Sequence, residues 1–186
     1  MRIIARTDPG KVRKSNQDSY AAGEFRNGVA WAVVCDGMGG NVGGNIASST
    51  AVRSISERIT TAYRENMSSS SIRNLLVTAI TNANFEIFDM ASANPELAGM
   101  GTTVVAAIMD DANIYVAHAG DSRAYIVNKS SIRQITRDHS LVQKMIENGE
   151  ITEEEAQKRM NEDVPTEDDA TDEDYQAALR EMGVKV

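Results

Sequence analysis

The feature that most constrains this chain is an apolar run that ends in a carboxylate and then a glycine-rich stretch. The run covers residues 29–35 and leads into Asp36-Gly37-Met38-Gly39-Gly40. Such a run is typical of a buried strand, and glycines leave the neighbouring main chain accessible because they have no Cβ. Carboxylate and carbonyl oxygens together suit a hard cation, whereas an acid at the head of the loop would repel a phosphate group. The pattern therefore predicts metal chemistry at a strand end.

Length and cysteine content indicate one domain in a reducing compartment. The chain has 186 residues and a single cysteine, which excludes an internal disulfide. No apolar stretch is long enough for a signal peptide or a membrane span, so we expect a cytoplasmic protein with no membrane partner.

The charge is concentrated in one flank. The net charge is −8, but residues 150–174 hold 12 of the 27 acidic residues and only 2 of the 19 basic ones. The rest of the chain is nearly neutral, which argues against nucleic-acid binding through a basic face. We interpret the acidic flank as a solvated segment.

The first half of the chain predicts two strands, the buried run and two helices. Short strands are expected at residues 2–7 and 18–25, before the run that ends at Asp36. Apolar residues at helical spacing predict a helix over residues 44–66. The serines at 68–71 break this helix, and a second helix is expected to start with a serine cap and to stop near Asn94-Pro95.

In the second half of the chain, the spacing of apolar residues changes from a helical to a strand-like pattern. Short runs rich in β-branched residues, at 102–109, 113–119, 123–127 and 132–136, predict an antiparallel meander. Residues 139–148 are expected to be helical, and Thr152 with Glu155 forms the capping box of another short helix. Strands, two helices and further strands indicate an α+β fold.

Three acids stand where strand ends or turns would expose them, and an arginine stands near one of them. The acids are Asp18, Asp36 and Asp121, and Arg13 precedes Asp18 by five positions. Each aspartate alone could serve only local turn hydrogen bonding, and Gly120-Asp121-Ser122-Arg123 could be a plain hairpin turn. Together they would need a cation, and oxygen ligands favour Mg²⁺ or Mn²⁺. Arg13 could donate two hydrogen bonds to phosphate oxygens, or it could form a salt bridge with one of the carboxylates.

Five short motifs in order give the chain a family resemblance over residues 1–155. It resembles the bacterial PP2C-type (PPM) metal-dependent protein serine/threonine phosphatases. The motifs are Val12-Arg13-Lys14-Ser15-Asn16-Gln17-Asp18-Ser19, Asp36-Gly37-Met38-Gly39-Gly40, Gly101-Thr102-Thr103, Ala119-Gly120-Asp121-Ser122-Arg123-Ala124-Tyr125 and Arg137-Asp138-His139-Ser140-Leu141-Val142.

The resemblance implies a four-layer α-β-β-α sandwich, incomplete at its C-terminal end, with Mn²⁺ or Mg²⁺ at one end of two packed sheets. By the resemblance, Asp36 would bridge two ions, the Gly37 carbonyl would bind one of them, and Asp18 would hold metal-bound water. Asp121 would belong to a third, weaker site, and Arg13 would bind the substrate phosphate. The implied reaction is direct hydrolysis of phosphoserine or phosphothreonine by metal-activated water.

The chain departs from the family pattern at two points. The glycine loop of the family usually continues with a histidine, regarded as a general acid, where this chain has Asn41. Asparagine can donate a hydrogen bond but cannot give up a proton near neutral pH. The later metal-binding Asp-Gly and Asp-Asn pairs of the family have no counterpart, because the only Asp-Gly is Asp36-Gly37 and no Asp-Asn occurs.

These patterns lead to two functional hypotheses. The first is a phosphatase domain over residues 1–160, with a flap at about 140–160, followed by an acidic loop and terminal helix over 161–186. Its substrates would be proteins phosphorylated by a serine/threonine kinase. The alternative is a truncated or degenerate, catalytically weak module that binds phosphoproteins or a regulatory partner.

Overall fold

The computed structural model describes residues 1–11 and 15–156, and the chain divides into two units, with the boundary between His139 and Ser140. In the first unit the strands and helices follow in the order β1 (Asp18–Glu24), β2 (Ala30–Met38), α1 (Gly40–Ala62), α2 (Ser69–Ala93), a 3₁₀ turn (Pro95–Leu97), β3 (Gly101–Thr102), β4 (Val104–Met109), β5 (Ile114–Ala119), β6 (Tyr125–Val127) and β7 (Ile132–Gln134). The second unit begins with α3 (Leu141–Glu147). The predicted α+β class is confirmed.

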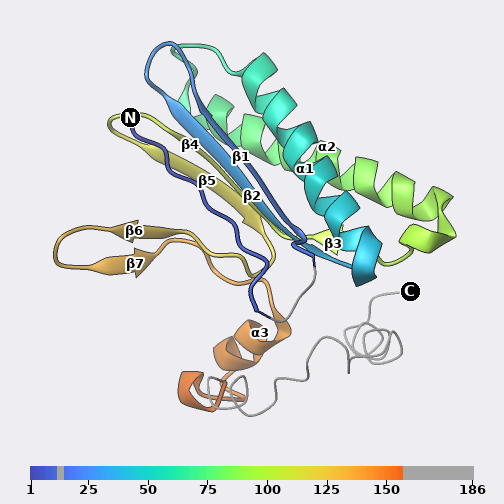
Figure 1. The fold of residues 1–186 in the computed structure, drawn as a ribbon. Helices are drawn as coiled ribbons and strands as arrows, with labels where there is room; N and C mark the ends of the chain where they lie inside the picture. The colour runs from blue at the N-terminus through green and yellow to red at the C-terminus, as the bar shows by residue number, and fades with distance from the viewer. Residues whose placement is uncertain (12–14, 157–186) are drawn as a thin grey trace. The chain divides into compact units, whose positions relative to one another are not determined.

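The main sheet is antiparallel in the order β1-β2-β4-β5, and β3 pairs with β2 beside β4 (Figure 1). β3 keeps the register of β4 on β2, since Gly37 pairs with Thr102 as Val34 pairs with Val105. The apolar run of the sequence is the central strand β2, which contacts strands on both sides. The chain reverses between β4 and β5 where the Asp110 carboxylate accepts hydrogen bonds from the amides of Ala112 and Asn113.

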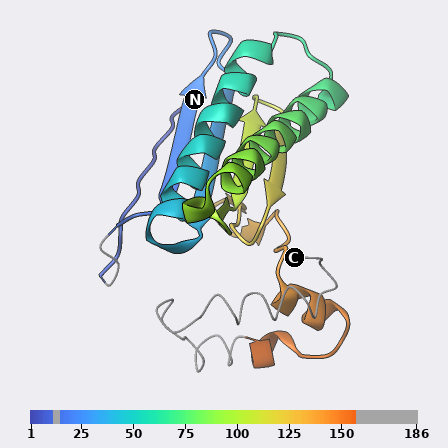
Figure 2. The same ribbon diagram turned by 90° about the vertical axis from the view of Figure 1, so that its right-hand side faces the viewer.

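The helices α1 and α2 lie side by side over one face of this sheet (Figure 2). Alternate residues of β2 and β4, such as Val33 and Ile108, are buried beneath them. The other face is more open, since Tyr20 and Val34 are 44% and 47% exposed. One packed and one open face is common in antiparallel sheets. The fully buried side chains of the core include Val33, Cys35, Ile55, Ile59, Leu76 and Ile108.

Helix α1 begins four residues before its predicted start, at Gly40, and ends at Ala62 rather than at residue 66. The glycines join the helix because they allow its first turns to pack closely against other main chain. A Cβ on Gly43 would come within 3.0 Å of Met100, and one on Gly44 within 2.8 Å of the Gly37 carbonyl carbon. Close packing thus places residues predicted as loop inside a helix.

The predicted caps of the later helices are confirmed. The Ser68 side chain accepts a hydrogen bond from the Ser71 amide at 3.2 Å at the start of α2, which ends at Ala93 before Asn94-Pro95. In the second unit, the Thr152 amide donates to the Glu155 carboxylate and the Glu155 amide donates to the Thr152 hydroxyl. The domain boundaries and the flap remain predictions, and the terminal helix expected after residue 161 lies outside the described residues.

Two strand predictions are wrong. Residues 2–7 pair with no strand of the described part of the chain, although the Met1 ammonium donates to Glu24 and the Asn16 side-chain amide donates to Thr7. The start of the segment thus lies near the end of β1, and the end of the segment lies near the residues just before β1, so the two run in opposite directions. The four later strands also do not form one meander, because β6 and β7, among the residues that the structure describes, pair only with each other, apart from the main sheet (Figure 1).

Within the described residues, no helix is both long enough and apolar enough to cross a membrane. The four-layer arrangement remains a prediction, since the described part of the first unit shows one sheet with helices on one face and a separate two-stranded ribbon.

Candidate functional site

Two of the predicted site residues are brought directly opposite each other. Asp18, at the start of β1, pairs with Asp36, near the end of β2. Directly opposed residues point to the same face, with Cβ atoms roughly 4.5–5.5 Å apart, and like charges in this position repel each other. Both aspartates are exposed at the open end of the ladder. A divalent cation between the two carboxylates would relieve this repulsion, so the pair fits the predicted chemistry.

The glycine after Asp36 is required by close packing. Gly37 is buried, and a Cβ there would collide with the Gly44 carbonyl of α1 and lie 2.9 Å from the Gln17 carbonyl oxygen. The Gly37 amide donates to that Gln17 carbonyl at 3.3 Å. The start of α1, the residue before Asp18 and the residue after Asp36 therefore meet at one point.

The main chain of Asp36 is held by two threonine hydroxyls. Its amide donates to the Thr103 hydroxyl at 3.0 Å, while its carbonyl accepts from the Thr103 amide at 2.8 Å and from the Thr102 hydroxyl at 2.9 Å. Thr103 is only 3% exposed. These bonds fix the direction in which the Asp36 side chain leaves the strand.

Asp121 lies at the same end of the sheet, between two residues that both contact Thr103. The Ser122 hydroxyl is 2.6 Å from the Thr103 hydroxyl, and Gly120 lies so close to Thr103 that a Cβ would come within 2.8 Å of it. Because β5 and β6 belong to different sheets, the Gly120–Arg123 segment is a connection between them, and the alternative of a hairpin turn is wrong.

The described donors supply only part of a metal coordination sphere. Among residues 1–11 and 15–156, no group of three or more His, Cys, Asp or Glu side chains could hold a metal ion. Asp121 is thus not gathered with Asp18 and Asp36 into one three-acid group. Two carboxylates and the nearby main-chain carbonyls are oxygen donors suited to Mg²⁺ or Mn²⁺, which readily keep water ligands. Arg13, the predicted phosphate ligand, lies outside the described residues.

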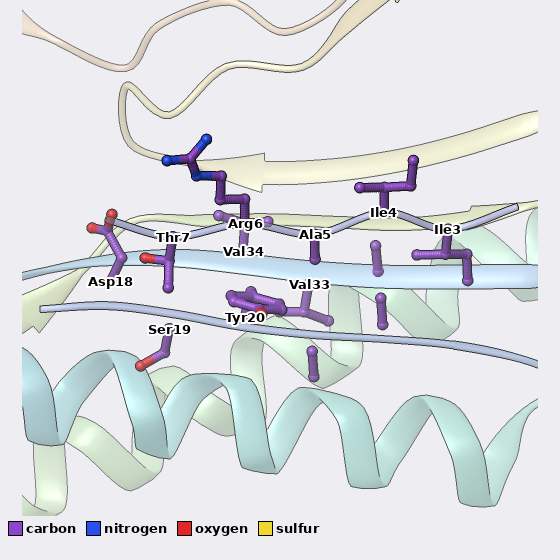
Figure 3. A pocket seen from close by; sticks show the side chains of 13 residues that line it. Ile3, Ile4, Ala5, Arg6, Thr7, Asp18, Ser19, Tyr20, Val33 and Val34 are labelled. Carbon is purple, nitrogen blue, oxygen red and sulfur yellow. The ribbon is translucent and has the colours of Figure 1, made fainter. Parts of the chain in front are cut away.

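A pocket of about 280 Å³ leads along the open face of the sheet to Asp18. It lies between the N-terminal segment, at Ile3–Thr7, and strands β1 and β2. Figure 3 shows Asp18 at one end of the pocket and Ile3 toward the other, with Ser19 directed toward α1. The lining is mostly apolar away from Asp18, so the polar chemistry of this face is concentrated at the aspartate end.

An ion pair anchors the segment that follows β7. The Arg123 Nε and a terminal nitrogen donate to the Asp138 carboxylate at 3.0 and 2.6 Å, and Gln134 adds a bond at 3.2 Å. These hydrogen bonds from Arg123 are the main reason that the pKa of Asp138 lies below its usual range. The His118 and His139 rings stack at 4.5 Å, and the His139 amide donates to the Gly120 carbonyl. These contacts hold His139 next to His118 of β5 and to Gly120.

Sequence reasoning missed the hydroxyl side chains around the aspartates. Besides Thr103 and Ser122, Ser48 of α1 is fully buried and lies next to the residues that flank Asp18. A serine at an apolar position of a helix was the available signal, since buried polar groups require partners. The neighbouring Cys35 has no such role: burial raises the pKa of its thiol to about 12, against a smaller opposite effect of a Thr102 hydrogen bond.

The chain is similar to known proteins over most of its length. A family model described as Protein phosphatase 2C matches residues 11–172. A serine/threonine phosphatase stp of Listeria monocytogenes is 39% identical over 154 residues, which cover 81% of this chain and 60% of that protein.

Solved structures agree with this similarity. The crystal structure of serine/threonine phosphatase Stp1 from Staphylococcus aureus matches with a TM-score of 0.74 at 35% identity, covering 81% of this chain and 58% of that one. The catalytic domain of the phosphatase PstP, solved in complex with two manganese ions, matches with a TM-score of 0.69 at 32% identity, covering 81% and 61%. This chain therefore spans about 60% of the length of these relatives.

Proposed function

Since this chain belongs to the protein phosphatase 2C family, we propose that it hydrolyses phosphoserine and phosphothreonine in proteins with the help of Mn²⁺ or Mg²⁺. The observation that supports this most is the direct opposition of Asp18 and Asp36 in the β1–β2 ladder. Two carboxylates that face each other across a ladder repel, and a cation shared between them would offset this repulsion. The manganese-bound relative makes Mn²⁺ the first ion to test.

We assign to the residues the roles that the family resemblance implies. Asp36, held by Thr102 and Thr103, would present its carboxylate to two ions, and the Gly37 carbonyl would add a ligand. Asp18 would orient a water from the opposite strand, and Asp121 would serve a separate, weaker site. Arg13 would hold the substrate phosphate through two parallel hydrogen bonds. When bound, the ions would lower the pKa of the attacking water and offset charge on the phosphoryl oxygens.

The complete fold would be the four-layer sandwich of the family. The open face of the sheet, with the exposed Tyr20 and Val34, would be the surface that faces the second sheet. The substrates would be proteins phosphorylated by a serine/threonine kinase. Nucleic acid is not expected as a partner, because the body of the chain is nearly neutral.

A second candidate is a catalytically weak module that binds phosphoproteins or a regulatory partner. The observation that favours it is the absence of a three-ligand acidic group from the described residues, together with the lack of a second Asp-Gly and of any Asp-Asn in the sequence. An ion with two carboxylates fewer would be held less tightly.

Phosphatase assays with added Mn²⁺ distinguish the two. We expect hydrolysis of p-nitrophenyl phosphate and of a phosphothreonine peptide, and we expect Asp36→Asn to abolish both. Titration calorimetry of the same protein should show Mn²⁺ uptake that Asp36→Asn removes. Folded protein that neither turns over substrate nor takes up Mn²⁺ would contradict the phosphatase proposal, whereas peptide binding without turnover would favour the second candidate.

A further inference from the structure

We propose that two buried hydroxyl groups, those of Ser48 and Thr103, are positioning residues that hold Asp18 and Asp36 in the geometry that binds metal. This inference rests on the proposed function, because it concerns the same pair of carboxylates. Both side chains are almost completely buried, with exposed fractions of 0% for Ser48 and 3% for Thr103. Buried hydroxyls persist where they make hydrogen bonds that the structure needs.

Ser48 contacts the residues on both sides of Asp18, through the main chain of Gln17 and the side chain of Ser19. From α1, its hydroxyl donates to the Gln17 carbonyl at 2.6 Å and lies 3.0 Å from the Ser19 hydroxyl. Gln17 and Ser19 are the immediate neighbours of Asp18 in the chain. The Asp18 amide itself donates to the Asn16 side chain at 3.0 Å. The helix therefore fixes the start of β1 at the residue that carries the carboxylate.

The same contact reaches the second strand. The Gln17 carbonyl that accepts from Ser48 also accepts from the Gly37 amide at 3.3 Å. Gly37 directly follows Asp36. A single carbonyl thus connects the α1 hydroxyl with the segments that carry both aspartates.

Thr103 holds Asp36 from the opposite side. Its hydroxyl accepts from the Asp36 amide at 3.0 Å, and its own amide donates to the Asp36 carbonyl at 2.8 Å. The Ser122 hydroxyl, 2.6 Å away, extends this chain of hydrogen bonds toward the Asp121 turn. Each bond in such a chain polarises the next, so the group is stronger than its separate members.

This positioning matters because the two carboxylates repel each other in the absence of an ion. Removing either hydroxyl would allow one strand end to move and separate the carboxylates, so that metal binding would have to bring them back together. Residues that orient metal ligands without touching the metal typically change metal affinity by 10- to 100-fold when mutated. We expect a loss of this size for Mn²⁺ in Ser48→Ala and in Thr103→Val.

Matched controls separate positioning from general destabilisation. Ser49→Ala removes an exposed hydroxyl that donates to carbonyls of its own helix, at Asn45 and Ile46, so Mn²⁺ affinity should be unchanged. Thr103→Ser keeps the hydroxyl and should restore affinity to near the wild-type value. The measurements are the Mn²⁺ dissociation constant by calorimetry and the unfolding midpoint without metal, for each folded variant.

The outcomes are distinct. If wild-type protein binds Mn²⁺ and both hydroxyl-deleted variants bind it equally well, the positioning role is wrong while the proposed function stands. If wild-type protein takes up no Mn²⁺, the proposed function fails and this inference fails with it. Should Thr103→Val not fold, the comparison of Ser48→Ala with Ser49→Ala decides the question by the same criterion.

Discussion

The carbonyl of Gly44, in the first turns of α1, fills the space that a Cβ on Gly37 would need at the end of β2. The other near neighbour of that position is the Gln17 carbonyl oxygen, at 2.9 Å. Because these atoms belong to the main chain, no rotation of a side chain could make room. The glycine that follows Asp36 is thus fixed by packing, apart from any use of its carbonyl as a ligand.

Gly37→Ala should therefore destabilise the protein by about 3 kcal/mol, at the upper end of the cost of overpacking. Urea unfolding in metal-free buffer would measure this loss. Gly101→Ala is a matched control on the neighbouring strand, because a Cβ there makes only ordinary contact with Met38 at 3.4 Å. We expect a change below about 1 kcal/mol for the control. Equal effects of the two substitutions would show that the close approach of α1 is not what requires Gly37.

Asp18→Asn should affect stability in opposite directions with and without metal. Without metal, it removes the repulsion from Asp36 across the ladder and should raise the free energy of unfolding by about 0.2–1 kcal/mol. With Mn²⁺, the wild type should gain stability by binding and the variant should gain much less. Thermal unfolding with and without Mn²⁺ measures both effects.

The control for this experiment is Asp111→Asn, which makes the same charge change in the turn between β4 and β5, at the other end of the sheet. It should leave the stabilisation by Mn²⁺ unchanged. A drop in metal-free stability for Asp18→Asn would contradict the inferred repulsion.

Asp138→Asn should reveal a pH-dependent contribution to stability. Arg123 lowers the pKa of the Asp138 carboxyl in the folded protein, so the ion pair stabilises the fold above the unfolded pKa of about 3.9 and is lost as pH falls through the folded value. We expect the variant to be less stable by about 1 kcal/mol above pH 5, a modest value because Arg123 is 46% exposed. The difference should shrink as pH falls below about 4.

Urea unfolding between pH 3 and 7 would measure this dependence. Arg123→Gln should show the same trend, and the double variant should lose little more than either single one. A difference between wild type and Asp138→Asn that stays constant with pH would contradict the assignment.

Cys35 should resist thiol reagents in the folded protein. Burial raises its pKa to about 12, so at pH 8 only a fraction on the order of 10⁻⁴ is thiolate, the reactive form. Ellman's reagent should therefore label the native chain only as fast as it opens, and label it completely in denaturant. Stoichiometric labelling of native protein within minutes would contradict the buried environment.

Asn41→His tests the departure from the family pattern. If a general acid is missing, the histidine should raise kcat on a phosphothreonine peptide by up to about 10²-fold, because the alkoxide leaving group needs a proton. The rate with p-nitrophenyl phosphate should change little, since its leaving group is a weak base. Asn41→Gln serves as the control without a titratable group, and equal gains on both substrates would argue against an acid role.

Local sequence signals predicted the regular elements well. The buried run became β2, the serine cap became the start of α2, and the Thr152–Glu155 capping box formed as expected. These features depend on residues a few positions apart, so short-range patterns are enough to find them. The same holds for placing Asp36 near a strand end.

Long-range packing decided the cases that local patterns missed. Residues 2–7 have strand-like composition but lack a ladder partner among the described residues, and the glycines after Gly39 entered α1 because β2 lies against its first turns. The positioning contacts of Ser48 and Thr103 join residues 31 and 67 positions apart, at Gln17 and Asp36. No periodicity in the sequence reports such contacts.

The sequence by itself determined the family and most of the helices and strands, because motifs and short-range propensities depend on residues that are close together in the chain. Only the tertiary structure decided that Asp18 and Asp36 face each other while Asp121 stays outside their pair. That outcome depends on strand register and on close contact between main chains, which arise when distant segments pack.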